Sequence, residues 1–432
     1  MDLFPQTERR DSLIVDTTPA DARNQGSINL GLEIVAKAWK ADVCSWPDTV
    51  NPALYSRIGF NVYYPMHLLN IGPFMRLNGL LGTRKAHIVA GGQGLGINHI
   101  LKGIVDEEFY GEIDYQANAS KIVSDAVIKN GKAAIEISRG CRMLCAFCEY
   151  AGTQKSYREK DIELVKEQVK EIRRNGIRRV NFLSANFAGY SKLDELMECV
   201  VANGIQVLNC DSCATFIPRL YPWLKQLPKM IKIGVESFDP ETRNRIGKKF
   251  SDEFLSELIE NLIAKDVVGI HMYLIYGLQG DNYDTWFQWQ KKLGDLRKRY
   301  TESDKNLFGE TETRNTKNIR FEFNITNFEP SAGTPLANAP EVDFVEKAKF
   351  LESWTAGLFR EGFRRGDKAI EYKTARGRFG RKELSYKMLM MLKKGGPELT
   401  DRLLNALPKG IGRSVSDEEA ERFLQYSCKT SA

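Results

Sequence analysis

Hydrophobic and polar residues alternate along the chain in blocks that predict strands and helices in regular succession. Up to about residue 118, the apolar runs SLIVD, VCSW, IGFNVYY, AHIVAGG and EFYGEID read as strands. The segments NLGLEIVAKAWKAD and HLLNIGPFMRLNGLL between them have the apolar spacing of helices. Because strands that alternate with helices pair in parallel through crossover connections, residues 1–118 are expected to form a Rossmann-like domain.

The same alternation restarts at residue 119 and continues to about residue 340. Strands are predicted at AAIEIS, RVNFLS, IQVLNC, IKIGVES, GIHMYLIYG and IRFEFNITNF, with amphipathic helices such as DIELVKEQVKEIRRNG between them. Six such units predict a partial (βα)6 barrel, which places functional residues at the carboxyl ends of its strands. The polar stretch 301–318 is expected to be a surface insertion, and residues 341–432 a basic, helical C-terminal region. The fold class is therefore α/β.

Composition narrows the class of protein. Hydrophobic residues make up 42% of the chain and charged residues 27%, and no apolar run is long enough to span a membrane. The first fifteen residues lack the apolar core of a secretory signal, so we expect a cytoplasmic protein without a membrane partner. Eight sparsely placed cysteines do not suit a disulfide framework, and they are expected to be reduced thiols or metal ligands.

The most specific signal is a run of three cysteines directly after the first predicted barrel strand. Cys141, Cys145 and Cys148 are separated by three and two residues, so three thiols share one loop. Thiolates suit zinc or iron–sulfur clusters, and a closed structural site normally takes four ligands. Three ligands leave one metal position open for a substrate. The alternatives are a zinc site completed by a distant residue and three unrelated core cysteines.

This Cys-x3-Cys-x2-Cys stretch, at the end of a barrel's first strand, closely resembles the motif of the radical S-adenosylmethionine (SAM) superfamily. The resemblance implies a [4Fe-4S] cluster held by the three cysteines, with SAM bound at the unligated iron. It further implies reductive cleavage of SAM to a 5′-deoxyadenosyl radical, with the electron coming from a donor such as flavodoxin or ferredoxin. Phe147 occupies the aromatic position that contacts adenine in the superfamily.

Other strand ends resemble the SAM-binding segments of the same superfamily. Ser184 and Asn186 end the second strand, where the superfamily holds the SAM amino group; the usual acid is replaced by Asn186. Glu236 and Ser237 end the fourth strand, where the resemblance implies contacts with the ribose hydroxyls and the methionyl carboxylate. The alternative for these two is a strand-end cap ahead of the Asp-Pro helix start.

Two later segments extend the resemblance. Tyr276 and Gly277 lie at the end of the fifth strand, in the segment that packs against adenine. The sixth-strand exit, residues 328–336, resembles that of methylthiotransferases and of radical SAM proteins with cobalamin-type domains.

A Rossmann-like domain ahead of the barrel is the arrangement of cobalamin-dependent radical SAM methylases, which makes cobalamin a candidate cofactor. None of the four histidines falls in the Asp-x-His-x-x-Gly pattern of the cobalamin lower ligand, and some members bind cobalamin without it. Methylthiotransferases need three more cysteines in this domain, and only Cys44 is present, so methylthiolation is not expected. The glycine-rich stretch 91–96 fits a phosphate site or a tight turn.

Two further cysteines, Cys210 and Cys213, lie at the end of the third predicted barrel strand. At the barrel mouth this pair could donate a hydrogen atom to a product radical, which makes both residues candidate catalytic groups. The alternative is that two small side chains simply pack the top of the barrel.

Positive charge is concentrated near the C-terminus. Between Arg360 and Lys394 there are twelve Lys or Arg against four Asp or Glu, interleaved with aromatic residues. Basic and aromatic side chains together suit phosphate neutralisation and base stacking, so nucleic acid is a candidate substrate. The candidate contacts are in the densest part of the run: Arg376, Arg378, Arg381 and Lys382. A solvated helix face is the alternative.

The leading hypothesis is a radical SAM enzyme that abstracts hydrogen from a modified nucleobase and rearranges or isomerises it. Amino-acid-decorated thymidine in phage DNA is the candidate substrate, in which case the site of action is the host cytoplasm. The alternatives are a cobalamin-dependent methylase of a small molecule or peptide and a tRNA-modifying radical SAM enzyme. A third, non-enzymatic hypothesis is that the cluster is structural or senses the redox state and takes no part in catalysis.

Overall fold

A computed structural model describes residues 10–19, 29–82, 84–95, 99–110, 124–149, 157–301, 320–363, 379–395, 399–412 and 415–426. The chain divides into two compact units. The first comprises residues 1–119, 331–333 and 380–432, and the second comprises residues 120–330 and 334–379. Among the described residues, none of the helices combines the length and apolar character that a membrane crossing requires.

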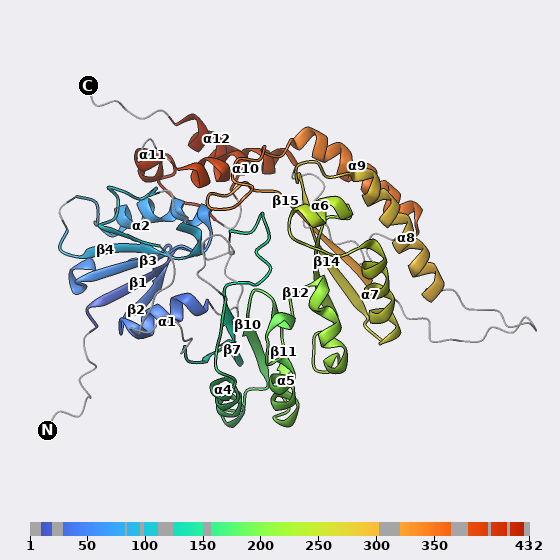
Figure 1. Ribbon diagram of the computed structural model, residues 1–432. Coiled ribbons are helices and arrows are strands. Elements are labelled where there is room, and N and C mark those ends of the chain that lie inside the picture. The colour runs from blue at the N-terminus through green and yellow to red at the C-terminus, as the bar shows by residue number, and fades with distance from the viewer. Residues whose placement is uncertain are drawn as a thin grey trace, which may run out of the picture. The chain divides into compact units, whose positions relative to one another are not determined.

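The first unit is built on a five-stranded parallel sheet with the strand order β2-β1-β3-β4-β5 (Figure 1). Its strands are β1 (Ser12–Asp16), β2 (Asp42–Ser45), β3 (Arg57–Asn61), β4 (His87–Gly91) and β5 (Glu107–Phe109). This order reverses direction between β1 and β3, and ligands of doubly wound sheets bind outside the carboxyl ends at such a point. The Rossmann-like prediction is confirmed.

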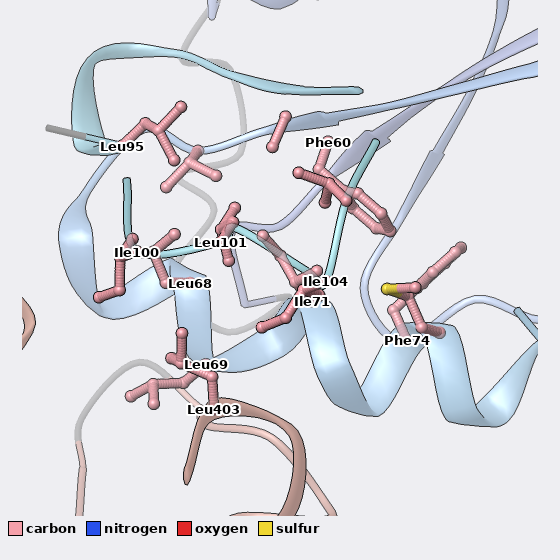
Figure 2. Close-up of a cluster of buried hydrophobic side chains, with 14 of the residues drawn as sticks. Phe60, Leu68, Leu69, Ile71, Phe74, Leu95, Ile100, Leu101, Ile104 and Leu403 are labelled. Carbon is pink, nitrogen blue, oxygen red and sulfur yellow. The ribbon is translucent and has the colours of Figure 1, made fainter. Parts of the chain in front are cut away.

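Helices from both ends of the sequence build the core of this unit. Helix α1 (Leu30–Ala38) and helix α2 (Ile71–Leu77) come from the crossovers of the sheet. Helices α10 (Phe379–Lys394), α11 (Leu399–Asn405) and α12 (Asp417–Gln425) come from the end of the chain. Figure 2 shows Leu403 of α11 against the cluster that contains Leu69 and Phe74.

The C-terminal region expected at residues 341–432 therefore does not form a third unit. Helix α9 (Phe344–Arg360) belongs to the barrel unit, whereas residues 380–432 belong to the first unit. The reason is the apolar face of these last helices: Leu403 and Phe423 are buried in the same hydrophobic core as Phe60 of β3.

The second unit contains the six predicted barrel strands, arranged in two sheets. One sheet has the order β11-β10-β7-β6, and the other has the order β12-β13-β14-β15. The bounds are β6 (Val127–Lys129), β7 (Lys132–Glu136), β10 (Arg179–Leu183), β11 (Gln206–Val207), β12 (Ser212–Cys213), β13 (Met230–Glu236), β14 (Gly269–Tyr276) and β15 (Arg320–Asn327). All neighbours pair in parallel except β6 with β7. The third predicted strand, residues 205–210, is reduced to β11, and the short strand β12 that follows it joins the other sheet.

Helices cover the outer face of these strands (Figure 1). They are α4 (Ile162–Arg174), α5 (Leu193–Ala202), α6 (Pro240–Arg245), α7 (Asp252–Ala264) and α8 (Tyr283–Thr301), followed by α9. Helix α4 illustrates how the sequence produces them. Its side chains Val165, Val169 and Ile172 recur on one face and are buried, while Asp161 caps the first turn by accepting hydrogen bonds from two backbone N–H groups.

Candidate functional site

The three-cysteine loop leaves the barrel at the carboxyl end of β7, after the short strand β8 (Ser138–Arg139). Gly140 turns the chain with a φ of 72°, a backbone conformation that glycine adopts without a steric cost. The backbone N–H of Ala146 donates to the carbonyl of Ile246 (3.0 Å), and the N–H of Cys148 donates to the carbonyl of Cys145 (3.0 Å). The first bond attaches the loop to the end of α6, and the second closes a turn within the loop.

The thiol of Cys145 lies in a buried, charged environment. Lys248 and Glu236 form an ion pair with a 3.0 Å separation and side-chain exposures of only 7% and 11%. Burial raises the pKa of the Cys145 thiol to about 12, and the Lys248 ammonium opposes this rise. Burial by itself would lower the pKa of Lys248, but Glu236, Cys213 and Cys145 more than offset it and hold the pKa above its ordinary value. Lys248 is therefore a fixed positive charge beside the loop.

Gly234 of β13 leaves room for this ion pair. A Cβ atom at position 234 would lie 2.8 Å from Glu236 Oε1 and 3.0 Å from Lys248 Nζ. Any larger residue would displace one of the two charged groups. Glycine is thus needed at position 234 because two charged side chains lie close to its Cα atom, and not because the backbone turns there.

The loop offers the type of ligand that an iron–sulfur cluster needs, which is cysteine thiolate. Cys141, Cys145 and Cys148 are free cysteines, and soft thiolates beside a buried ammonium suit such a cluster. In the described part of the chain, no three Cys, His, Asp or Glu side chains already converge tightly enough to hold a metal ion. The structure thus defines the position of the loop and the ion pair beside it. Binding of a cluster would require the side chains of the three cysteines to turn toward one another.

The residues predicted to hold the SAM amino group lie next to this loop's strands. Ser184 and Ser138 share a hydrogen bond between their hydroxyls (2.7 Å). Asn186 is 8% exposed, and its Oδ1 accepts the backbone N–H of Cys213 (3.2 Å). Asn186 therefore joins the ends of the second and third predicted strands, and its oxygen retains one lone pair for a ligand. Phe147 is half-buried in the cysteine loop.

Glu236 and Ser237 differ in what they offer a ligand. Glu236 ends β13 with a φ of 69° and is paired with Lys248. Ser237 is fully buried; its hydroxyl donates to Asp281 Oδ1 (2.6 Å) and accepts the N–H of Asp239 (2.9 Å). Asp239 in turn caps α6. The Ser237 hydroxyl is thus used in the strand-to-helix connection, which corresponds to the capping alternative.

Tyr276 packs against helices. Its ring stacks on Tyr283 of α8 (5.0 Å between centroids, 14°) and contacts Phe350 of α9 (5.2 Å). Gly277 has a φ of 93°, and a Cβ there would lie 2.6 Å from a methyl carbon of Val342. Side chains alternate between the two faces of a strand, and the Tyr276 side chain lies on the face of β14 that packs against α8 and α9. A role in packing adenine would therefore require the surrounding aromatic residues to move.

Cys210 and Cys213 face different surroundings. Cys210 is 1% exposed, and burial raises the pKa of its thiol to about 12. Cys213 is 5% exposed and lies close enough to Cys145 and Lys248 to affect the pKa of both groups. Of the two candidate catalytic thiols, only Cys213 is thus near the three-cysteine loop.

The candidate nucleic-acid contacts fall at the edge of what the structure describes. Arg376 and Arg378 lie outside the described residues. Arg381 and Lys382 lie in the first turn of helix α10. The surface insertion predicted at 301–318 also lies outside the described residues, apart from Thr301.

The carboxyl edge of the first unit's sheet carries polar groups that the sequence pattern did not single out. Asp16 ends β1 and is 8% exposed, and its charge acts on His67 of the 3-10 turn Pro65–Asn70. Burial lowers the pKa of His67. His67 Nδ1 and the amide nitrogen of Asn61, at the end of β3, are buried and have no hydrogen-bond partner among the described residues. Their position directly after β1 and β3 is the signal that could have identified them.

The glycine-rich stretch approaches the same edge. A Cβ at Gly92 would lie 2.5 Å from the carbonyl oxygen of Val62, and one at Gly94 would lie 2.5 Å from the backbone of Tyr64. Close backbone packing, the tight-turn interpretation, accounts for these two glycines.

Residues 135–293 match the radical SAM superfamily. This range begins in β7 and includes the three-cysteine loop, Asn186 and Glu236. Residues 135–293 thus form a radical SAM domain. Its residues that match the superfamily motif are Cys141, Cys145 and Cys148, and the cofactors of this superfamily are a [4Fe-4S] cluster and SAM.

Solved structures extend the likeness of this radical SAM enzyme to the whole chain. The radical SAM methyltransferase TsrM from Kitasatospora setae, with cobalamin and a [4Fe-4S] cluster bound, is similar over 76% of this chain and 74% of its own, at 11% identity and a TM-score of 0.50. TsrM with tryptophan substrate and the SAM analogue aza-SAM bound is similar over 97% of this chain and 96% of its own, at 10% identity and a TM-score of 0.50. At these identities the likeness concerns the fold. A comparison with curated protein sequences finds no match.

Proposed function

We propose that this radical SAM enzyme binds cobalamin in its first unit and transfers a methyl group from SAM to a small-molecule or peptide substrate. The observation that carries the proposal is the fold likeness to TsrM, which extends over both units and includes the C-terminal helices. This order of preference differs from the sequence-based one, because the fold likeness covers both units, whereas the basic run is a signal of composition alone.

The chain's own residues would act at two places. At the barrel, Cys141, Cys145 and Cys148 would hold the cluster, which supplies an open iron position and an electron for SAM. The Lys248 ammonium favours the thiolate form of Cys145, which is the form that binds metal. Asn186 fixes the backbone next to Cys213 and offers its remaining lone pair to an ammonium group.

At the first unit, the carboxyl ends of β1 and β3, where the strand order reverses, carry polar groups that suit an amide-rich ligand such as a corrinoid. Asn61 offers a buried amide N–H, and His67 offers a buried ring nitrogen. Buried polar groups without partners cost free energy, so a ligand that pairs with both is favoured. Tyr63 and Tyr64, which follow β3, are 59% and 39% exposed and add aromatic surface at the same edge.

The test is to reconstitute the protein anaerobically with and without cobalamin and to record the visible spectrum after removal of unbound corrinoid. Stoichiometric cobalamin bound to the wild-type chain, and reduced binding by Asn61→Leu, is the expected result. His87→Gln is the matched control, because His87 begins β4 at the opposite edge of the sheet and is exposed. Absence of bound corrinoid from the wild-type protein would overturn the proposal.

Product analysis separates methyl transfer from hydrogen abstraction. Methyl transfer converts SAM to S-adenosylhomocysteine, whereas reductive cleavage yields methionine and 5′-deoxyadenosine. Both products are quantified after anaerobic reduction, with flavodoxin or ferredoxin as the electron donor.

The second candidate function is the rearrangement of a modified nucleobase, including amino-acid-modified thymidine or a tRNA base. The excess of eight positive charges between Arg360 and Lys394 favours it. Binding of DNA or RNA that weakens steeply with salt and is lost in a variant with Gln at positions 376, 378 and 381 would support this function. Affinity that ignores both salt and these substitutions would exclude the nucleic-acid substrate.

A further inference from the structure

A row of charged side chains crosses the inner face of the sheet formed by β12, β13, β14 and β15. Strand pairing places Lys232 of β13 opposite His271 of β14, and His271 opposite Glu322 of β15. Because Ser212 pairs with Ile233, Asp211 lies next to Lys232 at the other end of the row. The residues next to the row along each strand, such as Ile231, Ile270 and Phe321, are buried and apolar, and the two-residue period of a strand places them on the opposite face.

One half of the row is held by contacts among Lys232, Asp211 and their neighbours. Lys232 Nζ donates to Asn209 Oδ1 (3.0 Å) and lies 3.3 Å from Asp211 Oδ1. Tyr273 contacts both Lys232 and Asp211. Lys232 and Asp211 retain 35% and 37% of their side-chain exposure, so solvent reaches the row.

The other half of the row, His271 and Glu322, contains one ring nitrogen without a hydrogen-bond partner among the described residues. His271 is 8% exposed, and its Nδ1 lies 3.0 Å from Glu322 Oε2. The second oxygen of Glu322 is paired with Arg320. His271 Nε2 is buried and has no hydrogen-bond partner among the residues that the structure describes. A buried ring nitrogen of this kind indicates that a ligand supplies the partner.

The Glu322 carboxylate decides what that partner must be. A carboxylate only accepts hydrogen bonds, so His271 Nδ1 must carry the proton and donate it to Glu322. In the neutral imidazole Nε2 then presents a lone pair, and its partner must be a donor. With Arg320, which is paired with Glu322, the row has two cations and two anions, and this balance disfavours a charged ligand group. The rings of His271 and Tyr273 lie 4.8 Å apart and offer an aromatic surface beside Nε2.

The row is also close enough to the cysteine loop to serve the same reaction. Asp211 precedes Cys213 by two residues, and Cys213 lies close enough to Cys145 to affect its pKa. Two residues of extended chain span about 7 Å. Because His271 lies two strands, about 10 Å, across from Asp211, a ring held by His271 would lie roughly 12 Å from Cys213.

We propose that the inner face of the barrel binds the substrate through His271 Nε2, which accepts a hydrogen bond from the N–H of an uncharged heteroaromatic ring. Glu322 is the positioning residue that fixes the tautomer of His271. This inference deepens the proposed function, since it names the substrate class of the barrel, and it applies to methyl transfer and to base rearrangement alike.

The test compares indole with 1-methylindole, a pair chosen because only the first carries an N–H. Binding of each ring to the cluster-loaded protein with SAM is measured by equilibrium dialysis. Indole is expected to bind at least about fivefold more tightly than 1-methylindole, the effect of one buried hydrogen bond. Equal affinities, or no binding of either ring, would overturn the proposal.

Glu322→Gln tests the tautomer without changing size. Arg320 holds the oxygen of the new amide, so its NH2 group faces His271 Nδ1 and donates to it. The proton of His271 then moves to Nε2, and the preference for indole should fall to about one. A preference that survives in Glu322→Gln would contradict the role of Glu322. Iron content and the cobalamin spectrum are read in parallel, so that failure of this inference is distinguished from failure of cofactor binding.

Discussion

The ammonium of Lys248 lies 3.0 Å from the carboxylate of Glu236, and neither side chain retains more than 11% of its exposure. Removal of one partner leaves the other as an uncompensated buried charge. Lys248→Met is therefore expected to lower the free energy of unfolding by about 3–5 kcal/mol, measured by chemical denaturation. The double variant Glu236→Gln/Lys248→Met should recover most of this loss. Lys249→Met, at the exposed neighbouring position, is the control.

The second prediction concerns the cluster ligands. Cys145→Ala should reduce bound iron and sulfide to near background after reconstitution and should abolish turnover of SAM, because the two remaining thiols cannot hold the cluster. Cys199→Ala, on the barrel helix α5, removes a partly buried thiol outside the loop and should keep the full iron content. Iron analysis and the visible spectrum provide the measurement. Equal iron content in the two variants would refute the assignment of the loop.

The third prediction concerns the pH dependence of stability. Burial raises the pKa of Asp281 to about 6, against the hydrogen bonds from Ser237 and Trp286, which lower it. The folded state thus binds a proton more tightly than the unfolded state. The resulting stabilisation is fully present below about pH 4, the ordinary pKa of an aspartic acid, and is lost as the pH rises through 6.

Asp281→Asn removes this ionisation and keeps the oxygen that accepts both hydrogen bonds. The variant should be more stable than the wild type by about 1–2 kcal/mol at pH 7.5, with the difference shrinking toward pH 4. Denaturation curves at both pH values give the comparison. Asp295→Asn, on the exposed face of α8, should show no such trend. A difference that is independent of pH would contradict the prediction.

The fourth prediction tests whether the last helices belong to the first unit. Leu403 is 2% exposed within the core shown in Figure 2. Leu403→Ala should cost about 2–5 kcal/mol of unfolding free energy, because it leaves a cavity in that core. Leu77→Ala on α2, where the side chain is 49% exposed, should cost well under 1 kcal/mol. Similar costs in the two variants would mean that α11 does not stabilise this core.

The sequence predicted the strands and the cysteine loop well because both are local signals. The period-two pattern of IKIGVES and GIHMYLIYG corresponds closely to β13 and β14, and Cys141, Cys145 and Cys148 are adjacent in one segment. The short length of β11 and the separate strand β12 were not predicted, because Ile205, Val207 and Leu208 favour a strand over the whole run IQVLNC.

Contacts between distant segments could not be predicted in the same way. Lys248 follows α6 and has no motif, so nothing in the sequence paired it with Glu236. Tyr276 and Ser237 lie at strand ends, as expected, yet their side chains are used in packing and capping. The assignment of residues 380–432 to the first unit depends on contacts across more than 300 residues, such as Ile411 N–H to Asn70 Oδ1 (2.7 Å).

These long-range contacts determine the order in which the two units can fold during translation. Because Leu403 and Phe423 complete a core that begins at Leu13, the first unit emerges from the ribosome with part of its interior exposed to water. The barrel strands β7 to β15 are all translated before that interior can close. The barrel unit can therefore fold before the core of the first unit is complete. A chaperone that shields the first sheet during translation would raise the yield of the complete chain.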